Sequence, residues 1–211
     1  MEEKIFEAIF ISLYVSGFAT ITSLLFSLPL GIILAIKNFP LKNIILAIIN
    51  SLTAIPPVCA GLLCYIFVSR AGVLGWMGIL YTPTAMIIAQ FIIITPIMLT
   101  LVIRNAQDEY PLYEEELRSY GAKLSDIIIL LLLNKYKIYF TISIIGFGRA
   151  VSEYGAAVIV GGSIDHLTRN ITATIAQETS KGNINLALQL GVVLIIFSFV
   201  VSFIGQINNK K

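Results

Sequence analysis

The sequence predicts an all-helical integral membrane protein with about five transmembrane helices. Of its 211 residues, 57% are hydrophobic and only 12% are charged, and the mean hydropathy of +0.91 lies outside the range of a soluble domain. The charges are clustered, which leaves four long stretches without any Asp, Glu, Lys or Arg: Ala8–Ile36, Asn43–Ser69, Ala71–Ile103 and Gly182–Asn209. Each stretch exceeds the roughly 20 residues that a helix needs to cross a bilayer.

We therefore expect residues 1–211 to form a single transmembrane domain. The expected spans are 8–36, 43–69, 85–103, 138–160 and 186–207, and residues 104–137 form the one long loop between spans. The fourth span is apolar apart from Arg149 and Glu153. Proline removes a backbone donor, so we expect kinks at Pro29, at Pro56–Pro57 and at Pro96. No length remains for a soluble catalytic domain, so any soluble machinery must come from a partner.

The distribution of Lys and Arg predicts the orientation of the chain. Nine of these residues lie in loops on the side of loop 104–137, whereas the opposite side carries four, namely Lys4, Arg70, Arg169 and Lys181. Positive charge marks the cytoplasmic side, so we expect a multi-pass protein of the cell membrane with its N-terminus outside and its C-terminus in the cytoplasm. The net charge of +2 gives no reason to expect nucleic-acid binding. Cys59 and Cys64 fall within the second span and are expected to have no redox or metal role.

Loop 104–137 contains the pattern of a short surface helix over residues 111–122, P-L-Y-E-E-E-L-R-S-Y-G-A. Pro111 suits a first helical turn, and three glutamates follow it at the positive end of the helix dipole. Tyr113, Leu117 and Tyr120 recur at spacings of three and four and offer one apolar side. Gly121 can adopt the left-handed backbone conformation that ends a helix. Such a helix on the cytoplasmic face is suited to dock in the groove of a partner, although the same pattern also fits a solvated connector.

This loop resembles the motif E-A-A-x-x-x-G-x(9)-I-x-L-P of the membrane subunits of binding-protein-dependent ABC importers. Glu115 and Gly121 match the motif, while Glu116 and Leu117 replace its two alanines. Leu131 and Leu133 fit the later apolar positions, and Asn134 stands where the motif has proline. The resemblance implies that Glu115, Glu116, Leu117 and Gly121 form a coupling site for an ATPase subunit.

Other segments are similar to the tungstate permeases within the molybdate and sulfate group. They are G-R-A-V-S-E-Y-G-A-A-V-I-V-G-G-S-I at 148–164, T-A-T-I-A-Q-E-T-S-K-G at 172–182 and Y-T-P-T-A-M-I-I-A-Q at 81–90. This resemblance implies the type I ABC importer permease fold and a homodimer in the membrane. It also implies two cytoplasmic ATPase subunits and an extracytoplasmic oxyanion-binding protein. The chain would translocate tungstate, or alternatively molybdate or sulfate, without hydrolysing ATP or binding a cofactor itself.

Arg149, Ser152 and Glu153 are the candidates for the translocation path. Arg149 and Glu153 lie four residues apart on one helical face, at a depth where a lone charge costs at least about 2.5 kcal/mol. The two side chains are expected to pair. The pair either is purely structural or places Arg149 where its guanidinium can donate to a dianion.

The single histidine, His166, lies in an outer loop beside Asp165 and Arg169. These residues and Lys181 are candidates for docking of the binding protein, and the alternative is ordinary solvated loop charge. An intramembrane hydrolase with Ser163, Asp165 and His166 is the competing function of another class, but residues so close in one loop rarely form a triad. We expect no catalytic residue and no metal site. A stand-alone channel or scaffold is compatible with the composition but not with the coupling-like loop.

Overall fold

The computed structural model describes residues 2–209, with side chains described for 5–114, 117 and 119–205. Within this part the chain folds into helices and contains no strand, which confirms the all-helical fold class. The elements in chain order are α1 (Glu2–Ile36), α2 (Lys42–Leu52), α3 (Pro57–Val68), η1 (Gly75–Met77), α4 (Pro83–Ser119), α5 (Leu124–Asn134), α6 (Tyr136–Val151), α7 (Gly155–Gly161), α8 (Ile171–Ser180) and α9 (Ile184–Asn209).

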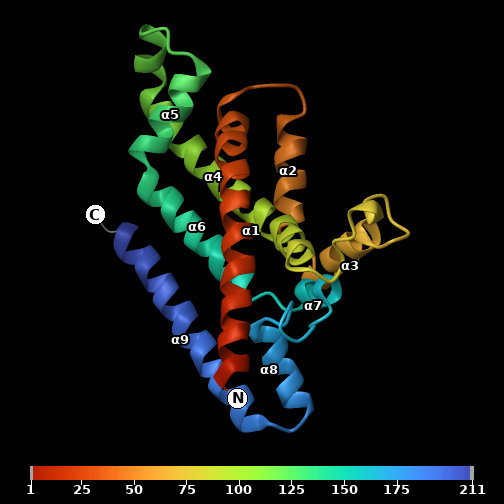
Figure 1. The fold of residues 1–211 in the computed structure, drawn as a ribbon. Helices are drawn as coiled ribbons and strands as arrows, with labels where there is room; N and C mark the ends of the chain where they lie inside the picture. The colour runs from red at the N-terminus through yellow and green to blue at the C-terminus, as the bar shows by residue number, and fades with distance from the viewer. Residues whose placement is uncertain (1, 210–211) are drawn as a thin grey trace.

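Three helices are long and apolar enough to cross a membrane as single elements. These segments are Ile5–Ile36 in α1, Pro83–Glu114 in α4 and Ile184–Gly205 in α9. Two bent helix pairs, α2 with α3 and α5 with α6, meet the same test when each pair is taken as one span, which gives up to five spans. Figure 1 shows α1 running through the centre of the molecule. Helix α4 crosses it, and α9 lies to its left in this view.

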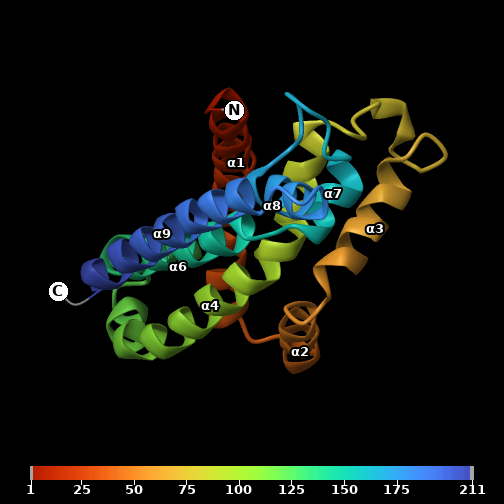
Figure 2. The ribbon, with the colours of Figure 1, turned by 90° about the horizontal axis from the view of Figure 1, so that it is seen from below.

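The expected second span, 43–69, is broken into two helices that meet at 100°. Pro56 is extended and Pro57 is the first residue of α3, so the two prolines separate the helices instead of kinking one. Pro29 and Pro96, in contrast, lie inside α1 and α4, which continue through them. In Figure 2, α3 extends to one side of the molecule beside α7, and α2 lies apart from it.

The segment 104–137, expected to be a loop, is almost entirely helical. Residues 104–119 continue α4, and α5 follows after a short turn and then meets α6 at 76°. The prediction that a separate helix starts at Pro111 is therefore wrong, because Pro111 lies inside α4. A proline within a helix loses its own backbone hydrogen bond but need not end the helix.

The expected fourth span, 138–160, is also interrupted. Helix α6 ends at Val151, and the short helix α7 begins at Gly155. Residues 152–154, which we call the α6–α7 break, are therefore non-helical in a segment that the sequence presents as one apolar run. Helix α6 contacts α1, α4 and α9, whereas α7 contacts α3 and α4, so the break lies where two parts of the helical assembly meet.

The core lies mainly between α1 and α4, which share the most extensive helix contact. Hydroxyl side chains form a buried stripe along α1, namely Ser12, Ser16, Thr20, Ser23 and Ser27. The Ser23 and Thr95 hydroxyls hydrogen-bond at 2.9 Å and link α1 to α4.

The outer faces of α1 and α9 expose large apolar side chains, including Phe10, Ile195 and Phe199. A hydrocarbon environment suits such a surface.

Candidate functional site

The α6–α7 break holds an ion pair. Nη1 of Arg149 donates to Oε2 of Glu153 at 2.9 Å, which confirms that the two charges pair. The Glu153 side chain is only 4% exposed, and its Oε1 accepts a hydrogen bond from the backbone N–H of Ala156 at 3.3 Å. The Arg149 side chain is 36% exposed. The carboxylate is therefore part of the interior, whereas the Arg149 side chain reaches the surface of the chain.

Side chains from outside α6 and α7 donate to backbone carbonyls at the break, although the Ala150 carbonyl also accepts from the backbone N–H of Glu153. The Glu153 carbonyl accepts from Nδ2 of Asn170 at 3.4 Å and from the Thr172 hydroxyl at 3.1 Å. The Ala150 carbonyl accepts from Nε2 of Gln90 at 3.0 Å. Interrupted helices persist at membrane depth only where such partners exist, so these contacts hold the break open.

Asn170 was not among the expected site residues, although it connects two parts of the site. Its Oδ1 accepts from the backbone N–H of Ala173 at 2.9 Å and so caps the N-terminus of α8. A signal for this role is present in the sequence, because an asparagine directly before a helical run is a common N-cap. Its second contact, with the Glu153 carbonyl, depends on the fold and has no local signal.

Ser152 lies in the same break, with its hydroxyl bonded to the Arg149 carbonyl at 3.0 Å and its side chain exposed. Tyr154 is exposed beside it. The structure therefore brings Arg149, Ser152 and Glu153 together, and Arg149 and Ser152 reach the surface of the chain. Their role in transport stays a prediction.

Helix α3 packs closely on α7 next to this ion pair. A Cβ atom added to Gly61 would lie 2.5 Å from Cα of Ala156, and one added to Gly155 would lie 2.6 Å from a methyl carbon of Val58. Glycine at both positions allows the two helices to approach this closely. The position of α7, and with it the Ala156 N–H that binds Glu153, thus depends on α3.

The expected coupling site corresponds to the C-terminal end of α4 and the turn that follows it. Gly121 has a φ of +63° and ends α4, with the N–H of Ala122 donating to the carbonyl of Leu117 at 3.0 Å. This is the helix-ending motif that favours glycine, as expected for Gly121. Leu117 is buried within the chain, whereas Tyr120 is 79% exposed, so the two residues do not lie on one common face. The side chains of Glu115 and Glu116 lie outside the described residues.

An ion pair links the far end of α5 back to α4. Nζ of Lys135, at the bend between α5 and α6, lies 2.8 Å from Oε1 of Glu109 in α4. The C-terminal part of α4 and the start of α6 are therefore held to one another.

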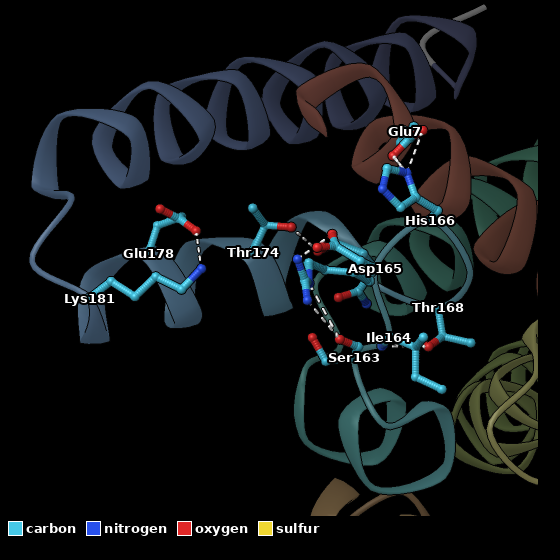
Figure 3. A network of polar contacts seen from close by, with 11 residues as sticks. Glu7, Ser163, Ile164, Asp165, His166, Thr168, Thr174, Glu178 and Lys181 are labelled. Atoms are coloured by element: carbon cyan, nitrogen blue, oxygen red, sulfur yellow. Dashed lines mark hydrogen bonds and ion pairs between the residues drawn. The ribbon is translucent and has the colours of Figure 1, made fainter. Parts of the chain in front are cut away.

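The opposite end of the molecule carries the polar network of Figure 3. Arg169 pairs with Asp165 and donates from Nε and Nη2 to the Ser163 carbonyl at 3.3 and 3.2 Å. Nδ1 of His166 lies 2.9 and 2.7 Å from the two carboxylate oxygens of Glu7 in α1. Nζ of Lys181 lies 2.8 Å from Oε1 of Glu178.

These contacts separate the four docking candidates into two kinds. Asp165, His166 and Lys181 are exposed, whereas the Arg169 side chain is only 16% exposed and ties the loop together. The same contacts give no support to a hydrolytic set, since Asp165 pairs with Arg169 and His166 with Glu7. Among the residues that the structure describes, no three or more His, Cys, Asp or Glu side chains gather as a metal site would require.

The chain is similar in sequence to known transport proteins over most of its length. Residues 27–211 match the family model described as "Binding-protein-dependent transport system inner membrane component". The chain is 39% identical to the tungstate uptake system permease protein TupB of Peptoclostridium acidaminophilum, over 95% of this chain and 88% of that protein.

Two further relatives come from other organisms. The chain is 33% identical to the TupB protein of Campylobacter jejuni, over 79% of this chain and 70% of that protein. It is 30% identical to a probable anion ABC transporter permease protein of Haloferax volcanii, over 92% of this chain and 86% of that protein. The family match over residues 27–211 therefore includes the turn after α4, the α6–α7 break and most of the remaining chain.

Proposed function

The chain belongs to the inner membrane components of binding-protein-dependent transport systems, and on this premise we propose that it carries a tetrahedral oxyanion, tungstate first, across the cytoplasmic membrane. As a permease of an ABC importer it is not an enzyme. ATP hydrolysis belongs to a separate ATPase subunit, and the cargo comes from a binding protein. We propose that this subunit itself binds no cofactor.

The 39% identity to a tungstate uptake permease over nearly the whole chain carries the assignment of the cargo. Sulfate and molybdate permeases are also related to this chain, at 26% and 24% identity. The tetrahedral oxyanions share charge and shape, and the binding protein meets the cargo first. Molybdate and sulfate are therefore the alternatives within the same function.

We propose that two copies of the chain form the transport unit, with the path between them. The guanidinium of Arg149 supports this arrangement, because it is partly exposed in a segment that the sequence presents as a membrane span. Although Glu153 pairs with it, an exposed charge at this depth is better accommodated by a water-filled path than by lipid. In a dimer, Arg149 and Ser152 would face the path, and Glu153 would hold the guanidinium in place.

We propose further that the turn after α4 lies in the cytoplasm, with the N-terminus outside and the C-terminus inside. Leu112 and Tyr120 are exposed near that end of α4 and offer apolar surface to an ATPase groove. Glu115 and Glu116 remain candidates there through the motif. Asp165, His166 and Lys181 would then face the binding protein at the other side, with Arg169 shaping their loop.

This arrangement supplies a route for coupling. Closure of the ATPase subunits would move the turn at Gly121, and the Glu109–Lys135 pair would carry the movement from α4 to the start of α6. Helix α6 ends at the break that holds Arg149 and Glu153. A rigid rotation of α6 would thus change the contacts around this pair and reorient the path.

The test is reconstitution of the permease with its ATPase and binding protein in vesicles, followed by uptake of radiolabelled tungstate. We expect uptake that requires ATP and all three proteins, with excess unlabelled molybdate and sulfate as competitors to rank the cargo. Uptake that persists without ATP and without the ATPase would indicate a channel. A permease that never co-purifies with an ATPase would also contradict the proposal.

A further inference from the structure

A small cavity lies between α2 and α4, away from the α6–α7 break. Its volume is about 90 Å³, and its polar lining consists of Asn50 from α2 and Thr100, Arg104 and Gln107 from α4. The three α4 residues follow one another at spacings of four and three, so they share one face of that helix. Figure 1 shows α2 beside the half of α1 that ends at Ile36, the half that we place toward the cytoplasm.

The lining carries several hydrogen-bond donors, of which those of Asn50, Arg104 and Gln107 belong to exposed side chains. The Thr100 hydroxyl is buried and makes no hydrogen bond. Within the described residues, no ion pair includes Arg104, and no acidic side chain lines the cavity. A guanidinium, two carboxamides and a hydroxyl together supply donors in several directions. This donor set suits a tetrahedral oxyanion, which presents acceptor oxygens on all sides.

The size and position of the cavity agree with this chemistry. One water molecule needs about 10–15 Å³ of such space, so the cavity can hold a body of several heavy atoms. Arg104 is the first charged residue after the charge-free stretch Ala71–Ile103, which places it where the apolar part of α4 ends. A soluble anion leaving the membrane and the phosphate of a lipid headgroup can both reach this level.

We propose that Asn50, Thr100, Arg104 and Gln107 form a binding site for a tetrahedral oxyanion on the cytoplasmic half of the permease. The placement on that half rests on the proposed function. The occupant is either the transported oxyanion on its way out or the phosphate group of an anionic phospholipid. The site differs from the path candidates at the break, since it shares no residue with Arg149, Ser152 or Glu153.

The test compares the purified permease–ATPase complex with three variants of the permease. Arg104→Gln removes the guanidinium, and Thr100→Val replaces the buried hydroxyl with a methyl group of similar size. Lys37→Gln is the control, because Lys37 is an exposed cation near the end of α1 and does not line the cavity. Delipidated samples are titrated with radiolabelled tungstate by equilibrium dialysis at constant ionic strength, and separately with phosphatidylglycerol by native mass spectrometry.

We expect Arg104→Gln to weaken binding of one of the two ligands at least about tenfold, Thr100→Val to weaken the same ligand, and Lys37→Gln to have no effect. Loss of tungstate binding identifies the cargo as the occupant, and loss of phosphatidylglycerol binding identifies the lipid. Equal affinities in the wild type and Arg104→Gln for both ligands, or an equal loss in Lys37→Gln, would overturn the site. ATP-driven uptake by the wild-type complex is measured separately, so a failure of the importer function is distinguishable from a failure of this site.

Discussion

The two partners of the ion pair at the α6–α7 break differ in burial, so removing each one should lower the stability of the permease by a different amount. Arg149→Met removes the guanidinium and keeps the aliphatic stem. It leaves the Glu153 carboxylate, which is 4% exposed, with the Ala156 N–H as its remaining partner among the described residues. Removing one partner of a buried ion pair costs about 3–5 kcal/mol, because the other charge stays desolvated.

The reverse change is expected to cost less. Glu153→Gln keeps a hydrogen-bonding side chain in the interior and leaves a guanidinium that is 36% exposed and can turn toward water. We expect about 1–3 kcal/mol for this variant. The double variant Arg149→Met with Glu153→Gln contains neither charge, so it should recover most of the stability lost in Arg149→Met.

The assay is unfolding of the purified permease by titration with a denaturing detergent, followed by helix content, for the wild type and all three variants. A cost below about 1 kcal/mol for Arg149→Met, the value of an exposed pair, would refute the reasoning from burial. Uptake by the double variant then separates structure from transport. A stable double variant without uptake supports Arg149 in the path, whereas normal uptake removes it.

Three further changes test the surroundings of the site. Gly61→Ala should destabilise the permease by about 1–3 kcal/mol, because the new Cβ would meet the backbone of Ala156. Gly17→Ala is the control and should leave the stability unchanged, because the space around Gly17 is open. The same unfolding titration compares the two variants. Gly121→Val should uncouple ATP hydrolysis from uptake more than Gly121→Asn does, because asparagine tolerates a positive φ; equal coupling in both would contradict a role for the backbone turn. Asn170→Ala should cost at least about 1 kcal/mol, because it removes both the cap of α8 and the donor to the Glu153 carbonyl, and Asn170→Ser, which keeps a capping hydroxyl, should cost less; the reverse order in thermal unfolding would argue against the cap.

The all-helical fold and the upper number of five spans could be predicted from composition. Contact with lipid requires long apolar stretches, and these appear in the sequence as runs without charge. Pro56–Pro57 marked the place of an interruption, because proline acts locally, but we expected a kink in one helix where the structure has two separate helices. The pairing of Arg149 with Glu153 followed from their spacing of four residues on one helical face.

The remaining features depend on contacts between distant residues. No proline precedes Gly155 in the expected span 138–160 to mark a break. The α6–α7 break is instead held by Asn170, Thr172 and Gln90 from distant parts of the chain. Pro111 carried the local pattern of a helix start, but the structure continues α4 through it. Whether a proline starts a helix or lies inside one depends on what precedes it, and here the preceding residues were already helical.

The proposed oxyanion site between α2 and α4 and the ion pair at the α6–α7 break also combine features that are readable in the sequence with features that depend on the fold. The spacing of Thr100, Arg104 and Gln107 is readable in the sequence, whereas the approach of Asn50 to their face requires the bend between α2 and α3. The opposite burial of Arg149 and Glu153 likewise follows from the packing of the neighbouring helices and not from their spacing.

The proposed transport mechanism requires the turn after α4 to face the cytoplasm and to receive the ATPase. Thiol labelling of Tyr120→Cys by a membrane-impermeant reagent, in a background without Cys59 and Cys64, measures this directly. Tyr120 is 79% exposed, and Val73→Cys, at a position 77% exposed in the turn after α3, is the matched control for the outer face. We expect labelling of Tyr120→Cys only in inverted vesicles, protection of it by the bound ATPase, and labelling of Val73→Cys only in intact cells. Labelling of Tyr120→Cys in intact cells, or no protection by the ATPase, would contradict this mechanism.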